Sequence, residues 1–140
     1  MAGEEQLSQA AVRVWFSFDP HGVRVDRFQP LVKTVQGSEP LDQQWEGVKS
    51  GAWVEVQDAE GRPLWRRGLV NPFGLRVETS EPDGRFRGGF LELDRGRFQV
   101  IVPQPRSAHE VVLFSSPRDR RRRRFGPARA LAAFELPRRR

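Results

Sequence analysis

The chain contains no cysteine, and it has only two histidines and two lysines. The absence of cysteine excludes a disulfide framework, a thiolate metal site and a cysteine nucleophile. His21 and His109 lie far apart in the sequence, so a zinc site or a Ser-His-Asp arrangement has few residues to draw on. No glycine-framed serine and no phosphate-binding glycine loop is present either. We therefore expect a protein that is not an enzyme, with no catalytic residues, no metal and no cofactor.

Long hydrophobic runs are also missing. No stretch approaches the roughly 20 apolar residues of a membrane-spanning helix. Residues 1–10 lack the basic and apolar regions of a secretion signal. These absences predict a cytoplasmic protein with no membrane partner. The 140 residues, of which 37% are hydrophobic, suffice for one folded domain.

Positive charge is scarce in most of the chain, although the formal net charge is +6. Residues 1–117 contain 14 Lys and Arg against 16 Asp and Glu, whereas residues 118–140 contain 10 Arg against two acids. The excess therefore belongs to the C-terminal part, which includes the uninterrupted run Arg120–Arg124. Such a run repels itself and is usually solvated.

β-branched and aromatic segments alternate with turn signals over residues 11–116, which predicts an all-β fold. In Ala11–Phe18 the apolar residues occupy every second position, as expected of a half-buried strand. The predicted architecture is an antiparallel, Ig-like two-sheet β-sandwich of about eight strands. The expected strands span residues 11–18, 23–35 with Pro30 marking an edge or bulge, 52–57, 63–69, 75–79, 85–93, 97–102 and 110–114.

Two connections stand out between these strands. Asp58–Gly61 has the length and the terminal glycine of a hairpin loop, so it predicts pairing of the strands on either side. Residues 36–51 are polar and rich in turn formers, with a single tryptophan, Trp45. We interpret them as a long loop that crosses from one sheet to the other and is held down by Trp45.

The composition divides the chain into three parts: a disordered N-terminus (1–10), the β-sandwich domain (11–116) and a basic linker with a short helix (117–140). The boundary is placed at Pro117. The helix is expected over Ala128–Leu136, because this segment is rich in helix formers and Pro127 would occupy the favoured first position.

The aromatic residues divide into core and surface candidates. Those that share a strand face with aliphatic residues are expected in the core: Phe16, Phe18, Trp53, Phe98 and Phe114. Trp15 lies on the opposite face of its strand, between Arg13 and Ser17. Trp65 precedes Arg66 and Arg67 and is interpreted as exposed beside them. Together Trp15 and Trp65 would form a platform for a sugar or a peptide, and burial of both is the alternative.

The C-terminal part has three possible roles: contact with a protein, contact with a nucleic acid, or no specific contact. Phe125, Leu131, Phe134 and Leu136, on a short amphipathic element, would dock into a groove of a partner. The arginines would instead contact nucleic-acid phosphates; they are Arg118, Arg120, Arg121, Arg122, Arg123, Arg124, Arg138, Arg139 and Arg140. A disordered, solubilising tail is the remaining alternative.

The segment GAWVEVQDAEGRPLWRRGLVNPFG, residues 51–74, resembles a block in the N-terminal sandwich domain of bacterial IgA-peptidase-type zinc metallopeptidases. The flanking segments VRVWFSFDPHGVRVDRFQPLV, FQVIVPQP and EVVLFSS are similar to strands of that domain, so the resemblance covers about residues 11–116. The peptidase domain and its HExxH helix have no counterpart in this sequence, and the tryptophan that the family has after Gly74 is missing. The resemblance implies a free-standing accessory module without peptidase activity.

These observations favour a non-catalytic protein-interaction module, a subunit or adaptor of a larger assembly. It would bind a protein partner through a sheet face, a sheet edge or its C-terminal part. The candidate partner-binding residues are Trp15, Trp65, Arg66, Arg67, Phe125, Leu131 and Phe134. Nucleic-acid association through the arginines and carbohydrate binding through Trp15 and Trp65 are the alternatives.

Overall fold

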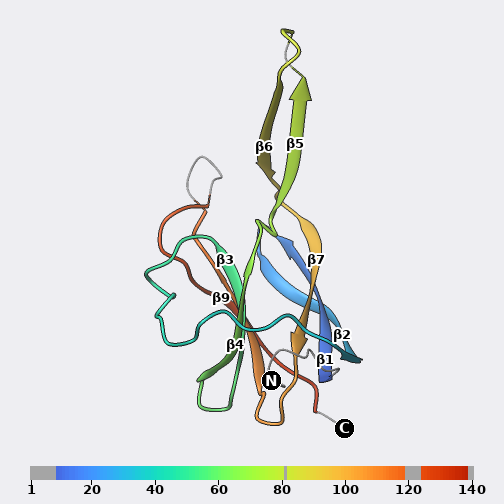
Figure 1. Cartoon of the computed structure of the whole chain (residues 1–140), viewed down its shortest axis with the longest axis vertical. Coiled ribbons are helices and arrows are strands. Elements are labelled where there is room, and N and C mark those ends of the chain that lie inside the picture. The colour runs from blue at the N-terminus through green and yellow to red at the C-terminus, as the bar shows by residue number, and fades with distance from the viewer. Residues whose placement is uncertain (1–8, 81, 119–123, 139–140) are drawn as a thin grey trace, which may run out of the picture.

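The computed structural model describes residues 9–80, 82–118 and 124–138, and these form an all-β structure (Figure 1). A three-stranded antiparallel sheet has the order β2-β1-β7, a four-stranded one has the order β4-β3-β8-β9, and β5 and β6 form a separate hairpin. The strands are β1 (Gln9–Asp19), β2 (Gly22–Lys33), β3 (Ala52–Gln57), β4 (Pro63–Leu69), β5 (Gly74–Ser80), β6 (Phe86–Glu92), β7 (Gly96–Pro103), β8 (Glu110–Ser115) and β9 (Arg129–Glu135).

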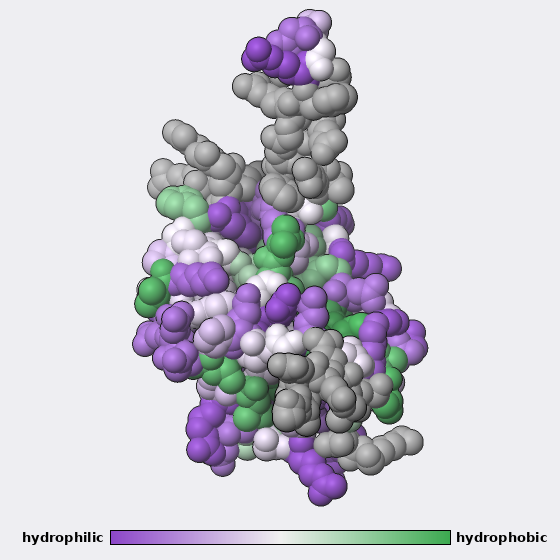
Figure 2. Space-filling view, in the orientation of Figure 1, coloured by the Kyte–Doolittle hydropathy of each residue, from purple (hydrophilic) through white to green (hydrophobic). Residues whose placement is uncertain are grey.

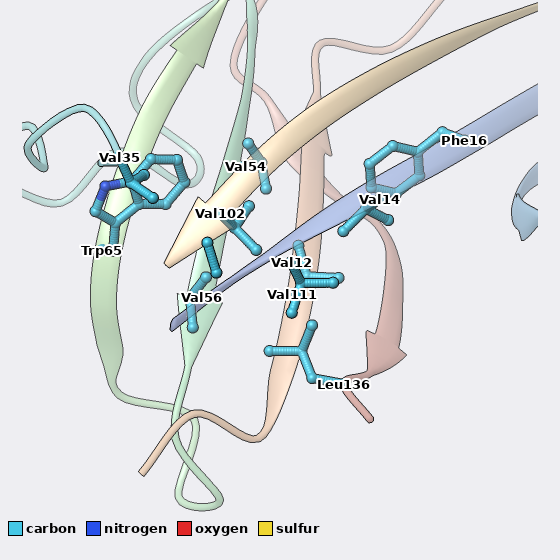
Figure 3. Close-up of a cluster of buried hydrophobic side chains, with 11 residues drawn as sticks. Val12, Val14, Phe16, Val35, Val54, Val56, Trp65, Val102, Val111 and Leu136 are labelled. Atoms are coloured by element: carbon cyan, nitrogen blue, oxygen red, sulfur yellow. The ribbon is translucent and has the colours of Figure 1, made fainter. Parts of the chain in front are cut away.

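The two larger sheets enclose the main core, as the alternation in β1 predicts. Val12, Val14 and Phe16 are fully buried and point toward the four-stranded sheet. Their partners in that sheet include Val54, Val56 and Val111, as Figure 3 shows. The arrangement is that of a β-sandwich, which confirms the all-β prediction in its broad form. The predicted disorder of residues 1–10 concerns residues 1–8, which lie outside the described residues, and Gln9 and Ala10, which begin β1.

The predicted β3–β4 hairpin is present, and Asp58 organises its turn. One carboxylate oxygen of Asp58 accepts hydrogen bonds from the backbone N–H groups of Glu60 and Arg62, at 3.0 and 2.9 Å. These N–H groups and the Arg62 side chain lower the pKa of Asp58, with the Arg62 backbone bond making the largest contribution. Gly61 follows with φ at 82°, a conformation that favours glycine.

The helix predicted over Ala128–Leu136 is wrong. Residues Arg129–Glu135 form β9, which pairs with β8 in the register Phe134↔Val111 and Ala132↔Leu113. Alternate residues Phe134 and Leu136 pack against the main core. The burial gained by this pairing overrides the helix propensity of the alanines. The four-stranded sheet therefore continues beyond Pro117.

Residues 36–51 form the predicted long loop, which we call the strap because it crosses the outer face of the four-stranded sheet. Trp45 is buried in it and packs edge-on against Trp53, with ring centroids 5.3 Å apart. Trp53 in turn stacks on Phe114 at 5.0 Å. Trp45 therefore holds the strap down, as the sequence predicts.

The β5–β6 hairpin projects from one end of the two sheets (Figure 1). At its base Phe73 is buried and packs edge-on against Phe18, and the Leu93 N–H donates to the Phe73 carbonyl at 2.8 Å. At its tip residues 82–85 are exposed and hydrophilic (Figure 2).

The described residues contain no helix that is long and apolar enough to cross a membrane.

Candidate functional site

A groove of about 650 Å³ lies between the edge strands of the two sheets, β7 of the three-stranded sheet and β4 of the four-stranded sheet. Residues 33–36, which lead from β2 into the strap, contribute to its wall. The complete lining consists of Arg13, Lys33, Thr34, Val35, Gln36, Trp65, Arg67, Gly68, Leu69, Val70, Gln99, Val100 and Ile101. The groove therefore combines four segments that are distant in the sequence, from β1, the β2–strap connection, β4 and β7.

The floor of the groove is apolar, and it includes buried residues of the core. Val35 and Trp65 are buried beside one another at the β4 side of the core (Figure 3). The Trp65 indole N–H donates to the Gln36 carbonyl at 2.8 Å, which fixes the ring and ties residue 36 to β4. The prediction that Trp65 is exposed is thus wrong, because its side chain points inward. A sugar platform made of Trp15 and Trp65 is not formed.

The edge of β7 that faces the groove has no backbone partner among the described residues. β7 pairs with β1 along one side, and no backbone hydrogen bond from another described segment reaches it. An edge strand keeps every second N–H and C=O group directed away from its neighbour. The groove is therefore bordered by a row of unpaired donors and acceptors.

The opposite border, β4, is already capped by the strap. The Glu39 N–H donates to the Arg66 carbonyl at 2.9 Å, and the Gly68 N–H donates to the Glu39 carboxylate at 3.0 Å. Backbone pairing with a further strand is thus blocked at these positions of β4. Of the two strands that border the groove, β7 is the one with pairing capacity.

The predicted contact residues Trp15 and Arg67 lie at this groove or next to it. Arg67 is half-buried and lines the groove directly. Trp15 lies on the outer face of β1, and the guanidinium groups of Arg13 and Arg27 lie over its ring at 5.5 and 4.8 Å from the centroid. Arg13 links the two features, because it also lines the groove.

Arg66 is not available to a partner, which corrects its selection as a contact residue. Its Nε lies 2.8 Å from the Glu55 carboxylate, and both side chains are about 6% exposed. One terminal nitrogen also donates to the carbonyls of Pro40 and Gln43, at 3.0 and 2.9 Å. Its guanidinium lies over the Trp45 ring. Arg66 thus anchors the strap.

The three predicted contact residues of the C-terminal segment do not share one face. Phe125 is 63% exposed, whereas Phe134 packs into the core against Phe16 at 6.0 Å. Leu131 is exposed and lines a second cavity of about 370 Å³ near the base of the β5–β6 hairpin. The loss of the helix separates these side chains, because alternate residues of a strand face opposite ways.

Two arginines of the basic C-terminal part, Arg118 and Arg124, form ion pairs with carboxylates. Arg118 pairs with Asp94 at 2.9 Å, and Arg124 pairs with Glu92 at 2.6 Å. The two arginines also form an isolated antiparallel bridge with each other. Arg138 is exposed. The remaining predicted phosphate contacts lie outside the described residues; they are Arg120, Arg121, Arg122, Arg123, Arg139 and Arg140.

Several groove residues were not selected from the sequence, notably Val70, Gln99 and Ile101. One signal was available: Phe98–Val102 is a nearly continuous apolar run without proline or an acidic residue. Such a run fits a buried strand, yet β7 is an edge strand. The juxtaposition of β7 with β4 had no signal in the sequence, because about 30 residues separate them.

No protein-family model matches the chain, and no curated protein or solved structure shows significant similarity to it. Within the described ranges no group of three or more His, Asp or Glu side chains is placed to hold a metal ion. The resemblance to the metallopeptidase accessory domain stays a prediction, as does the cytoplasmic location.

Proposed function

We propose that this chain is a non-catalytic protein-interaction module that binds an extended segment of a partner protein in the groove between β4 and β7. The segment would add a strand to the free edge of β7 and place every second side chain on the apolar floor. The observation that carries the proposal is the unpaired edge of β7 beside a groove of about 650 Å³. Recognition by strand addition uses these two elements, with backbone pairing for affinity and pockets for specificity.

The two outer strands of the three-stranded sheet support the choice of β7. β2 carries Pro30 and a bulge opposite Trp15 and Phe16, and both features hinder pairing with a further strand. β7 is regular along its pairing with β1, and its only proline, Pro103, is its last residue. An unprotected apolar edge is an aggregation hazard unless a partner covers it. The apolar composition and regular pairing of β7 are therefore those expected of an edge strand that binds a partner.

The experiment begins with random peptides displayed on phage, about ten residues long so that they exceed the usual strand length. They are selected on the full-length protein and measured as labelled peptides by fluorescence anisotropy. Selected peptides are expected to shift the backbone amide NMR signals of Gln99, Val100 and Ile101. Methylation of alternate peptide nitrogens should abolish binding, because it removes the donors that a strand needs.

Val70→Asp is the deciding variant. Val70 is 87% exposed and lines the groove, so the substitution introduces a charge beside the apolar floor without disturbing the core. We expect a loss of about tenfold or more in affinity. Val48→Asp is the matched control, because Val48 is 66% exposed and lies on the strap outside the groove lining. Equal affinities of the two variants, or amide shifts confined to the outer face around Trp15, would contradict the proposal.

Nucleic-acid association stays a prediction. Phosphate contacts would make binding weaken steeply with salt, whereas strand addition to β7 depends mainly on backbone pairing and apolar contact. Binding of labelled single-stranded DNA that disappears when Arg120–Arg123 are replaced by serine would assign a separate role to the basic run.

A further inference from the structure

All charged side chains that line the groove are positive. Its lining contains three cationic side chains, Arg13, Lys33 and Arg67, and no Asp or Glu. The nearby Glu39 carboxylate lies about 3.6 Å from the position of a Cβ on Gly68, which places it on the Arg66 side of β4, away from the floor. The groove is therefore a positively charged site with an apolar base.

These three cations lack a carboxylate partner among the described residues, in contrast to several other arginines. None of them forms an ion pair with a described residue, whereas Arg24, Arg62, Arg66, Arg118 and Arg124 all do. Arg13 makes one long contact of 3.5 Å to Gln29, and its buried Nε has no hydrogen-bond partner. Charges that could bind a ligand carboxylate are thus left free around the groove.

The pleat of a strand added to β7 determines which side chains meet these cations. Val100 of β7 pairs with Val14 and shares the inward face, whereas Ile101 pairs with Arg13 and shares the outward face. An added strand follows the same alternation. Its inward residues would contact Val35, Trp65 and Leu69, and its outward residues would lie on the face that carries Arg13 and Lys33. Arg67 lies on the inward face, because it pairs with the buried Val54.

We infer that the occupant of the groove is an extended peptide segment in which apolar residues alternate with Asp or Glu. The inference rests on the proposed function, because it specifies the chemistry of the same site. The apolar residues fill the floor, and the carboxylates meet Arg13 and Lys33 on the outward face. Rim charges contribute mainly to the choice of partner and to the rate of association.

The test uses three synthetic peptides that have valine at every second position and differ only at the others, which are Glu, Gln or Lys. Affinities for the full-length protein are measured by fluorescence anisotropy at low and high salt. We expect the Glu peptide to bind about tenfold more tightly than the Gln peptide, as a few partly exposed ion pairs allow. The Lys peptide should bind most weakly. High salt should reduce the difference.

Charge reversal provides the decisive control. Lys33→Glu should lower the affinity for the Glu peptide and raise that for the Lys peptide, because Lys33 is exposed, lines the groove and shares the outward face with Arg13. Arg106→Glu should change neither, because Arg106 is exposed and lies outside the groove. If all three peptides bind equally and lose binding in Val70→Asp, the acidic specificity is refuted while the groove remains a strand-binding site. If none of them binds, the inference is refuted, and the display selection then decides the proposed function by itself.

Discussion

The two sheets of the molecule differ in the treatment of their edges. Both edges of the four-stranded sheet are capped by the strap: Glu39 caps β4, and the Glu46 carboxylate accepts the Ala130 N–H of β9 at 3.0 Å. The three-stranded sheet has no such cover among the described residues. β2 relies on its proline and bulge, and β7 stays open. The chain itself therefore covers both edges of one sheet, whereas the other sheet keeps one edge without a backbone partner among the described residues.

The largest effect is expected where the strap is anchored. Arg66→Met would leave the buried Glu55 carboxylate without its ion-pair partner, which costs about 3–5 kcal/mol when one member of a buried pair is removed. The free energy of unfolding, measured by urea denaturation, should fall by that amount. Arg67→Met is the control in the adjacent position and should change it little, because Arg67 is half-buried and has no ion pair with a described residue. Similar losses in both variants would remove the distinction between the anchored and the free arginine.

The next effect compares the outer faces of the two sheets. Trp45→Ala should cost about 3 kcal/mol, since it opens a space between Trp53 and Arg66 and releases the strap. Trp15→Ala should cost less than about 1 kcal/mol, because Trp15 is only half-buried and its stacking on Arg13 and Arg27 is at the surface. Thermal and urea unfolding of the two variants measure the difference. A larger loss in Trp15→Ala would mean that the outer face of the three-stranded sheet is structural.

The smallest effect concerns the hairpin turn of each sheet. The pKa of Asp19, in the β1–β2 turn, is lowered chiefly by its bond from the His21 N–H, and that of Asp58 chiefly by the Arg62 N–H. A lowered folded-state pKa gives stability that is present above the unfolded value near 3.8 and lost as the pH falls through the folded value. Asp19→Asn and Asp58→Asn should each flatten the decline of the melting temperature between about pH 5 and pH 2, and the two effects should add. An unchanged acid profile in the double variant would contradict this role.

Local patterns in the sequence predicted much of the fold. The alternation in Ala11–Phe18 identified the inward face of β1, and the Asp58–Gly61 turn identified the β3–β4 hairpin. Both depend on neighbouring residues alone. The segment Ala128–Leu136 was misinterpreted for the same reason, because alanine favours a helix locally whereas the burial of Phe134 and Leu136 depends on β8 and β1.

The candidate site was predicted only in fragments. Arg67, a contact residue in the sequence analysis, lines the groove, whereas Trp65 and Arg66 are buried although they stand in a polar-looking run. In the structure one is covered by the core and the other by the strap. The strap that covers Arg66 comes from a distant part of the chain, so the sequence around Arg66 does not indicate it. For the same reason the sequence of β7 does not show that its edge is uncovered.

The register of β1 has a further consequence for the order of folding. β1 meets β2 across a short turn, but its other neighbour, β7, pairs through contacts such as Val12↔Val102 that span most of the chain. Contacts so distant in sequence form slowly, on the millisecond-to-second scale common for such topologies. During synthesis β1 therefore cannot pair with β7 until β7 has been made. A chain interrupted before Pro103 lacks a complete β7 edge. The groove therefore forms only after β7 has been synthesised.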